Sequence, residues 1–432
     1  MKALSIFISI FLSVNLFSQE AAQTVESFLS RCQYQQAIDY LNQKNDTTKE
    51  ADMQRVLCYN YLHNYPKAVD ILLSLQKKDS ADVQVKIQLA SAYNQLSMLP
   101  ESIKCFDELI KMDSTNTYFK IRKADLLYQS NKYDLALEEY KQAFNDNNSS
   151  YLSKQIASCF EKTQQWDSAK IYFEYALKID STDEKSKIEL IKIDINQEKY
   201  AAALYRSEVF LLTDTNNIQL NILKSFCFYE LSDYTNAIAN FERCRTLGDT
   251  SLLVNKYLGF SYFFTNKEDK AYPCLIQAFS QDTTNNSVLY ALASVNQTLE
   301  NFPEAIRLFE KLIQRVVPTN SVLYTYYKKL ADSYHKNKDY QPAIDNYKKA
   351  LKYFSGYQNL ELLFKIADLY DVYLHNYEMS IGYYRQYRES LVDYMQFLEK
   401  SDSTNENEIK SVSNKLKNLD EQINYVEGKI KK

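Results

Sequence analysis

A short pattern recurs along the chain at an almost constant interval. In "YTNAIANFERC", which begins at Tyr234, an aromatic residue precedes an alanine by three positions, and "YDLALEEYKQA" and "FPEAIRLFEKL" repeat this arrangement. The small residues at the alanine position are separated by 31, 34, 34, 33, 34, 34, 34, 34, 38 and 37 residues. A period of this length suits a repeated pair of helices and is too long for a coiled-coil heptad. The small residues are Ala37, Ala68, Ser102, Ala136, Ala169, Ala203, Ala237, Ala271, Ala305, Ala343 and Ser380.

Large side chains at fixed distances from the small residue predict how the two helices of each repeat pack. The residue three positions before it is aromatic in nine of the eleven copies, and a large residue usually follows four positions after it. The small residue lets a neighbouring helix come close, while the large ones on the same face fill the space around the contact. Another small residue stands twelve positions upstream in several copies, so each repeat is predicted to be an antiparallel helix pair. These upstream residues are Ala90, Ala124, Ala157, Gly259, Ala293 and Ala331.

The composition also indicates a helical protein. A sheet-rich chain of 432 residues needs many tight turns with positive φ, and 5 glycines cannot supply them. Four acid-hydroxyl segments predict turns whose side chains cap the next helix: "DSTN" at Asp113, "DSTD" at Asp180, "DTNN" at Asp214 and "DTTN" at Asp282. Pro273 lies two residues after Ala271, and we expect a local kink or a shortened helix there.

One copy carries a fuller set of signature residues. The stretch "YLGFSY" from Tyr257, followed by Ala271, Leu275 and Ala278, gives the pattern L-G-x-x-Y…A-x3-L-x2-A. With this copy and the near-constant spacing, the chain resembles a tetratricopeptide repeat protein over residues 24–390, although the proline usual at the end of the family repeat is missing. The resemblance implies an all-α, right-handed superhelical solenoid of about eleven helix pairs. Its inner wall would be lined by the first helix of each pair, and its partner would be a protein or peptide.

The family's ligand-facing positions lie about 18, 15, 11, 8 and 7 residues before the conserved alanine. Carried onto this chain, they place an aromatic set in the groove, and such rings with polar neighbours suit a peptide segment. The alternative is that these rings pack between helices. An envelope carbohydrate-binding protein that stacks sugars on the same rings is the alternative function. The predicted groove residues are Tyr118, Tyr128, Phe226, Tyr229, Phe260, Phe263, Phe264 and Tyr290.

Both ends of the chain differ from the repeats. Residues 1–18 combine Lys2, an apolar run and a small residue at a plausible cleavage point, which predicts a signal peptide and an exported, periplasmic or extracellular protein. No other stretch is apolar enough for a membrane span, so none is expected in the mature chain. Residues 391–432 are predicted to be C-terminal helices, and apolar residues from Ile409 to Ile430 follow a heptad pattern. That seam would either cap the last repeat or form a homodimer.

The sequence contains no recognisable catalytic motif. The 3 histidines are too few for most metal sites, and no glycine-rich phosphate loop or G-x-S-x-G elbow occurs. We therefore expect no enzyme, no cofactor and no metal. The net charge of −4 and the lack of a basic stretch argue against nucleic acid as a partner. The 7 cysteines form no C-x-x-C motif, and three share one repeat position, which favours packing over disulfides; pairing of Cys227 with Cys244 stays open.

Overall fold

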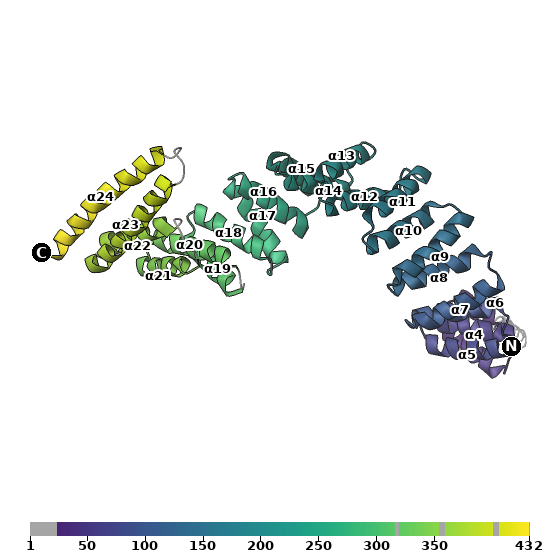
Figure 1. Ribbon diagram of the computed structural model, residues 1–432. Helices are drawn as coiled ribbons and strands as arrows, with labels where there is room; N and C mark the ends of the chain where they lie inside the picture. The colour runs from purple at the N-terminus through teal and green to yellow at the C-terminus, as the bar shows by residue number, and fades with distance from the viewer. Residues whose placement is uncertain (1–23, 316–318, 354–358, 401–405, 432) are drawn as a thin grey trace, which may run out of the picture. The chain divides into compact units, whose positions relative to one another are not determined.

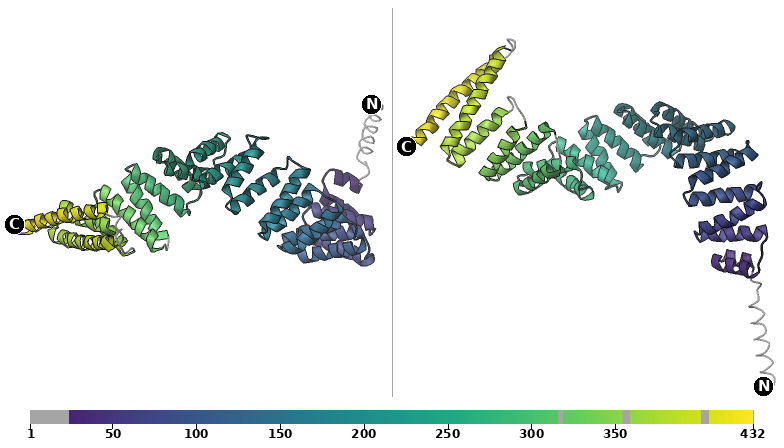
Figure 2. Two further views of the ribbon diagram at one scale, coloured as in Figure 1. Left: turned by 45° about the horizontal axis from the view of Figure 1, so that its top comes forward. Right: turned by 60° about the horizontal axis from the view of Figure 1, so that its bottom comes forward.

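The computed structural model describes residues 24–315, 319–353, 359–400 and 406–431, so the predicted signal peptide at residues 1–18 lies outside the described residues. Every element in these residues is a helix (Figures 1 and 2), and the predicted all-α class is confirmed. The chain forms two compact units, residues 1–193 and 194–432. Among the described residues, no helix is long and apolar enough to cross a membrane.

The first unit contains five successive helix pairs and most of a sixth first helix. Among the ten helices of the five pairs, each contacts the next one in the chain, as stacked helical repeats require. The helices are α2 (Val25–Ser30), α3 (Tyr34–Gln43), α4 (Lys49–Tyr61), α5 (Tyr65–Lys78), α6 (Val83–Gln95), α7 (Leu99–Met112), α8 (Thr117–Gln129), α9 (Tyr133–Asp146), α10 (Ser150–Lys162), α11 (Trp166–Ile179) and α12 (Glu184–Asn196), which continues into the second unit.

The second unit continues the same order of helices and ends in two long ones (Figure 1). Here too, helices from α13 to α21 contact their neighbours in chain order. The helices are α13 (Tyr200–Leu211), α14 (Ile218–Glu230), α15 (Tyr234–Thr246), α16 (Leu252–Phe264), α17 (Glu268–Gln281), α18 (Asn286–Thr298), α19 (Phe302–Arg315), α20 (Asn320–Lys336), α21 (Tyr340–Leu351), α22 (Leu360–Asp368), the π-helix η2 (Leu369–Tyr373), α23 (Tyr377–Lys400) and α24 (Glu406–Ile430).

The small residue of every repeat lies in the core. All eleven, from Ala37 to Ser380, are fully buried. Where serine replaces alanine, its hydroxyl donates to a carbonyl of the preceding helix: Ser102 Oγ to Ala90 O at 2.7 Å, and Ser380 Oγ to Ala367 O at 3.0 Å. Ala90 belongs to the predicted upstream small residues, so the two helices approach each other at the expected place. The small side chains at the two facing positions, alanine or serine on one helix and alanine on the other, permit that approach.

The turn inside each helix pair uses a residue with positive φ, and none of these residues is glycine. The residue five positions before each small residue has a φ between 51° and 68° in all eleven copies, Ser97 and Glu300 among them. The next residue donates its N–H back to a carbonyl five residues earlier, as from Met98 to Tyr93 and from Asn301 to Asn296, each at 2.9 Å. This is a Schellman motif, which ends a helix and satisfies its last carbonyls.

Glycine at these turn positions is expected to stabilise the protein. A side chain in the left-handed region costs about 1 kcal/mol because Cβ crowds the backbone, and glycine avoids that cost. Glu300→Gly should therefore raise the free energy of unfolding by about 0.5–1 kcal/mol, measured by urea denaturation. Glu300→Ala serves as the control, because it keeps Cβ and should gain little. Equal stability of the two variants would contradict the explanation.

The acid-hydroxyl segments cap the following helices as predicted. Asp282 accepts hydrogen bonds from the backbone N–H of Thr284 at 2.9 Å and from its hydroxyl at 2.6 Å, and the Thr284 hydroxyl in particular lowers the pKa of Asp282. Three residues later, Asn285 is the N-cap of α18 and accepts from the N–H of Val288 at 3.1 Å. The first acid thus closes the turn and the last residue caps the helix.

We expected a local kink or a shortened helix at Pro273, and the shortened helix is wrong. Helix α17 contains Pro273 as its sixth residue and is 14 residues long, the same length as α19. Proline has no N–H to donate to the carbonyl of Asp269. Both residues are exposed, so water can satisfy that carbonyl and the helix continues. Ala271 is fully buried, so the repeat register is kept in this copy.

The C-terminal heptad residues pack within the chain. Val412, Leu419, Ile423 and Val426 of α24 are buried against a cluster that includes Leu391 of α23. The ion pairs Arg385–Glu427 at 2.8 Å and Arg388–Asp420 at 2.6 Å, whose residue numbers run in opposite directions, show that the two helices are antiparallel. Within the chain the seam therefore packs against α23, as the cap alternative requires, and residue 390, the predicted end of the repeats, lies inside α23.

Candidate partner-binding cavity

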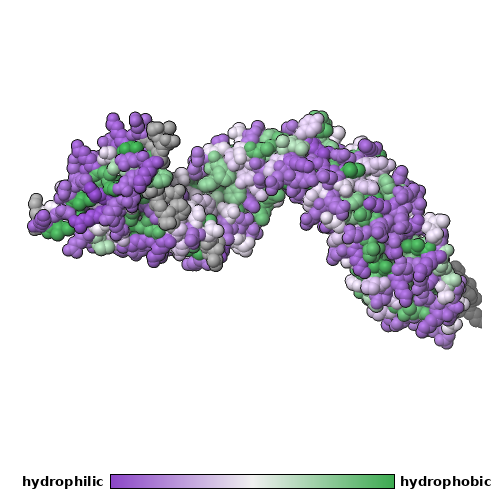
Figure 3. Space-filling view, in the orientation of Figure 1, coloured by the Kyte–Doolittle hydropathy of each residue, from purple (hydrophilic) through white to green (hydrophobic). Residues whose placement is uncertain are grey.

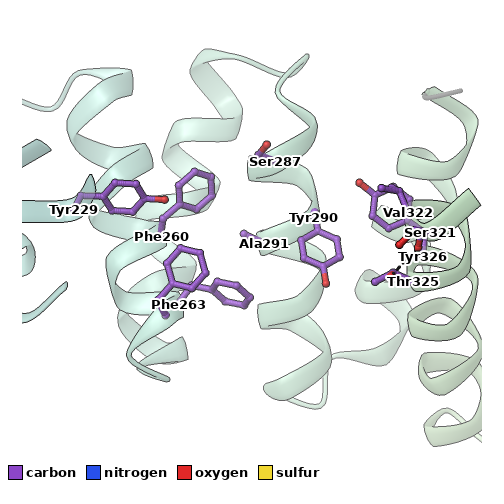
Figure 4. Close-up of a pocket in the computed structure, with 11 residues that line it drawn as sticks. Tyr229, Phe260, Phe263, Ser287, Tyr290, Ala291, Ser321, Val322, Thr325 and Tyr326 are labelled. Carbon is purple, nitrogen blue, oxygen red and sulfur yellow. Dashed lines mark hydrogen bonds between the residues drawn. The ribbon is translucent and has the colours of Figure 1, made fainter. Parts of the chain in front are cut away.

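A cavity of about 450 Å³ opens between the first helices of four consecutive repeats in the second unit (Figure 4). Tyr229 of α14 and three phenylalanines of α16 form one side. The other residues come from α18 and α20, and Figure 4 shows them opposite the α16 rings. From α16 these are Phe260, Phe263 and Phe264; from α18, Ser287, Tyr290 and Ala291; and from α20, Ser321, Val322, Thr325 and Tyr326.

Small residues on two helices create this space. An added Cβ at Gly259 would lie 2.8 Å from Leu275 of α17, so glycine lets α16 approach α17 closely while the following Phe260 lines the cavity. On α18, Ser287 and Ala291 lie between the α16 rings and α20 (Figure 4). A larger residue at either position would fill the opening, so the cavity depends on their small size.

Ring contacts hold the cavity walls in place. Tyr229 lies 6.4 Å from both Phe260 and Phe264, measured between ring centroids. Tyr290 stacks on Tyr326 at 5.6 Å, which joins α18 to α20. Such pairs are worth about 0.5–1.5 kcal/mol each beyond the area they bury. The walls are thus preorganised, which lowers the entropy that a partner would lose on binding.

The cavity lining is uncharged. Among the described residues that line it, none carries a charge or a carboxamide, and the polar groups are all hydroxyls. Burial raises the pKa of Tyr229 to about 12, so its hydroxyl stays neutral at neutral pH. A charge is close by, because Lys256 Nζ lies 6.0 Å from the centroid of the Phe260 ring. The lining itself favours apolar and neutral groups.

Five of the eight predicted groove residues meet in this cavity: Tyr229, Phe260, Phe263, Phe264 and Tyr290. The other three lie elsewhere. Phe226 packs edge-on against Tyr257 at 5.0 Å, half-buried between helices. Tyr118 and Tyr128 belong to the first unit, where Tyr118 is 51% exposed and Tyr128 is half-buried 5.2 Å from Tyr133.

The sequence reasoning missed the residues from α20 and the small residues of α18. Ser287 and Thr325 both stand eighteen positions before their alanines, at a ligand-facing position of the family repeat. The same spacing could therefore have found them. Tyr326 is one position away from that site and carried no such signal.

The aromatic residue three positions before the alanine has a second role. In three places its ring stacks on an aromatic residue of the next repeat, seven positions before that repeat's small residue: Tyr34 with Tyr61 at 4.5 Å, Tyr234 with Phe264 at 5.0 Å, and Tyr340 with Tyr373 at 4.3 Å. These contacts join successive repeats at the side where the ligand-facing positions lie. Phe264 therefore both lines the cavity and packs between repeats.

The first unit has a smaller cavity of about 240 Å³, lined in part by Asn60, Tyr61, Tyr65 and Gln95. The oxygen of the Asn60 carboxamide is buried there without a hydrogen-bond partner. Its lining is more polar than that of the second unit, and neither Tyr118 nor Tyr128 contributes to it. Among the residues that the structure describes, no cluster of histidine, cysteine and acidic side chains could hold a metal ion, and the seven cysteines are free.

The face in Figure 3 is mostly hydrophilic, with hydrophobic residues in small separate patches. This pattern is ordinary for the surface of a folded protein. The cavity is distinguished from it by the number of rings that converge there from consecutive repeats.

Residues 284–356 match the tetratricopeptide repeat family model. Among solved structures, the C-terminal part of a tetratricopeptide repeat protein from Cytophaga hutchinsonii is 20% identical, with 56% of this chain and 99% of that chain covered and a TM-score of 0.46. A tetratricopeptide repeat protein from Parabacteroides merdae is 14% identical, with 58% and 98% covered and a TM-score of 0.41. YrrB, described as a tetratricopeptide repeat protein with an unusual peptide-binding site, is 18% identical, with 43% and 96% covered and a TM-score of 0.37.

No curated protein sequence matches the chain. The family match covers α18 to α21, and the helices before and after them keep the same buried small residue and the same positive-φ turn. Residues 284–356 are therefore tetratricopeptide repeats, and the described helices on either side of them continue the same repeat architecture.

Proposed function

We propose that the protein is a non-enzymatic, exported scaffold whose cavity between α14 and α20 binds an apolar segment of a partner protein. The convergence of rings from four consecutive repeats on an uncharged space carries this proposal. Export rests on residues 1–18 of the sequence, which read as a signal peptide.

The dimensions of the site fit a peptide. Packed helices are about 8–10 Å apart, so α14 and α20, with α16 and α18 between them, are separated by at least about 25 Å along the repeats. An extended chain covers about 3.3 Å per residue, which gives a segment of about eight residues. The rings of α16 and the Tyr290–Tyr326 pair would hold its apolar side chains, and the hydroxyl groups would bind its backbone.

The same observation separates the peptide from the carbohydrate alternative. Sugar rings carry many hydroxyl groups, which are bound best by carboxylates and carboxamides beside a stacking ring. The described residues of the lining offer neither group. An apolar peptide side chain needs only the rings, so the lining favours the peptide.

Blocking the cavity with Ser287→Trp is expected to weaken peptide binding at least ten-fold. Ser287 is exposed at the N-terminal turn of α18, so an indole there fills the opening without entering the core. Binders would be selected from a random peptide phage library on the full-length protein, and their affinities measured by fluorescence anisotropy. Phe263→Ala should also weaken them, by about ten-fold or more, because buried aromatic residues dominate such interfaces.

Tyr205→Ala is the matched control, since Tyr205 of α13 is 71% exposed and does not line the cavity. It should leave the affinity unchanged. Equal binding by wild type and Ser287→Trp, or selection of binders without apolar residues, would refute the proposal. Binding of neutral oligosaccharides that Ser287→Trp abolishes would favour the carbohydrate function instead.

A further inference from the structure

A further cavity of the second unit, of about 670 Å³, lies where the C-terminal helices meet the last repeats. It is called the second cavity below, and the cavity between α14 and α20 is called the first cavity. The second cavity is bounded by α20, α22, α23 and α24, which all belong to the second unit. Its apolar part is formed by Phe364 of α22, Leu391 of α23 and Val412 of α24, among others. Because α24 supplies part of the lining, this site exists only when the C-terminal extension is folded onto the repeats.

Ammonium groups from three helices surround the apolar part. Lys328 of α20, Lys365 of α22 and Lys415 of α24 all line the cavity, and among the described residues of the lining the one carboxylate is Glu361. Glu361 accepts from Lys328 at 2.7 Å and from Lys365 at 2.9 Å, and Asp332, outside the lining, accepts from Lys365 at 2.8 Å. Each ammonium has three donors, so these pairs leave donors available on both lysines.

Lys415 is the most accessible of the three cations. It is exposed near the middle of α24, three residues after Val412, so the two side chains lie on neighbouring turns of the helix. The lining of this cavity therefore presents a positive charge beside an apolar surface, whereas the lining of the first cavity is uncharged. A ligand that satisfies both features must carry acidic and apolar groups together.

We infer that this cavity is a second binding site, for a peptide segment in which acidic residues alternate with apolar ones. In an extended segment successive side chains point to opposite sides. The apolar side chains would contact Phe364 and Val412, and the carboxylates would accept hydrogen bonds from Lys415 and Lys328. The inference goes beyond the proposed function, because the first cavity gives no preference for charge.

The test uses a fluorescein-labelled hexapeptide of alternating leucine and aspartate, amidated at its C-terminus so that no terminal carboxylate contributes. The full-length protein is expected to bind it at least five-fold more tightly than the same peptide with asparagine in place of aspartate, and the difference should shrink at high salt. Lys415→Glu should weaken the aspartate peptide about five-fold or more and leave the asparagine peptide nearly unchanged. Lys417→Glu is the matched control, since Lys417 is exposed on the same helix but does not line the cavity.

Ser287→Trp distinguishes the two sites. It should weaken binding at the cavity between α14 and α20 at least ten-fold and leave the aspartate peptide bound at the cavity formed with α24. Equal affinity for the two peptides, equal weakening by Lys415→Glu and Lys417→Glu, or absence of binding would each overturn the inference. Loss of the aspartate peptide in Ser287→Trp would also overturn it, because the peptide would then occupy the first cavity.

Discussion

Replacing Phe309 with alanine is expected to lower the free energy of unfolding of the second unit by about 4 kcal/mol. Phe309 of α19 is fully buried in the core cluster that joins helices α15 to α20. The substitution removes most of the side chain and leaves a space that the neighbouring fully buried Leu312 and Ala305 cannot fill, so the transfer and cavity costs add.

The same substitution should weaken binding at the first cavity. The Phe309 ring lies 6.2 Å from the ring of Tyr290, edge to face, and supports it from behind. Urea denaturation and the affinity for the selected peptides would be measured together. Leu299→Ala is the control, because Leu299 is 39% exposed just after α18 and should cost less than about 1 kcal/mol. Similar losses in the two variants would contradict the burial argument.

The fold could be predicted because the helix contacts depend on one small residue in each repeat. A side chain larger than serine at Ala271 or Ser380 would push the helices apart, so the spacing of these residues records the helix pairs directly. The turns could not be predicted in the same way. Scarce glycine argued only against a sheet-rich fold, and it gave no sign that Glu300 and Lys338 would adopt positive φ in the turns between helices. The helix core provides enough stabilisation to tolerate that strain.

The candidate site was only partly predictable because the carried-over positions identify a face of a helix and not the depth of a side chain. Phe260 and Phe226 both satisfied the spacing, but only Phe260 reaches the cavity, while Phe226 packs on Tyr257. The space itself is left by the small side chains of Ser287 and Ala291, and a pattern of aromatic residues does not indicate where small residues leave such a space. How deeply a side chain is buried depends on how successive repeats stack, and the residue pattern of a single repeat carries no information on that stacking.

Removing the charge of Lys429 is expected to release the C-terminal helix α24 from the last repeat. Asp371, in the π-helix η2, is 2% exposed and accepts from Lys429 Nζ at 3.0 Å and from Gln422 Nε2 at 2.9 Å. Lys429→Met keeps the length of the side chain but leaves the carboxylate with only the amide donor. An unpaired buried charge costs about 3 kcal/mol or more, and here the cost can be relieved by detaching α24.

Hydrogen exchange of the full-length protein would measure that detachment. Lys429→Met should speed exchange of the α24 amides about 100-fold, which corresponds to about 3 kcal/mol, and leave α14 to α19 unaffected. Arg385→Met removes the Arg385–Glu427 pair between α23 and α24, whose arginine side chain is 62% exposed, and should change exchange less than about five-fold. Adding Asp371→Asn to Lys429→Met should restore much of the protection, since no buried charge is then left. If Lys429→Met changed exchange as little as Arg385→Met does, the apolar seam alone would hold α24, and the buried charge of Asp371 would not be what fastens it to the last repeat.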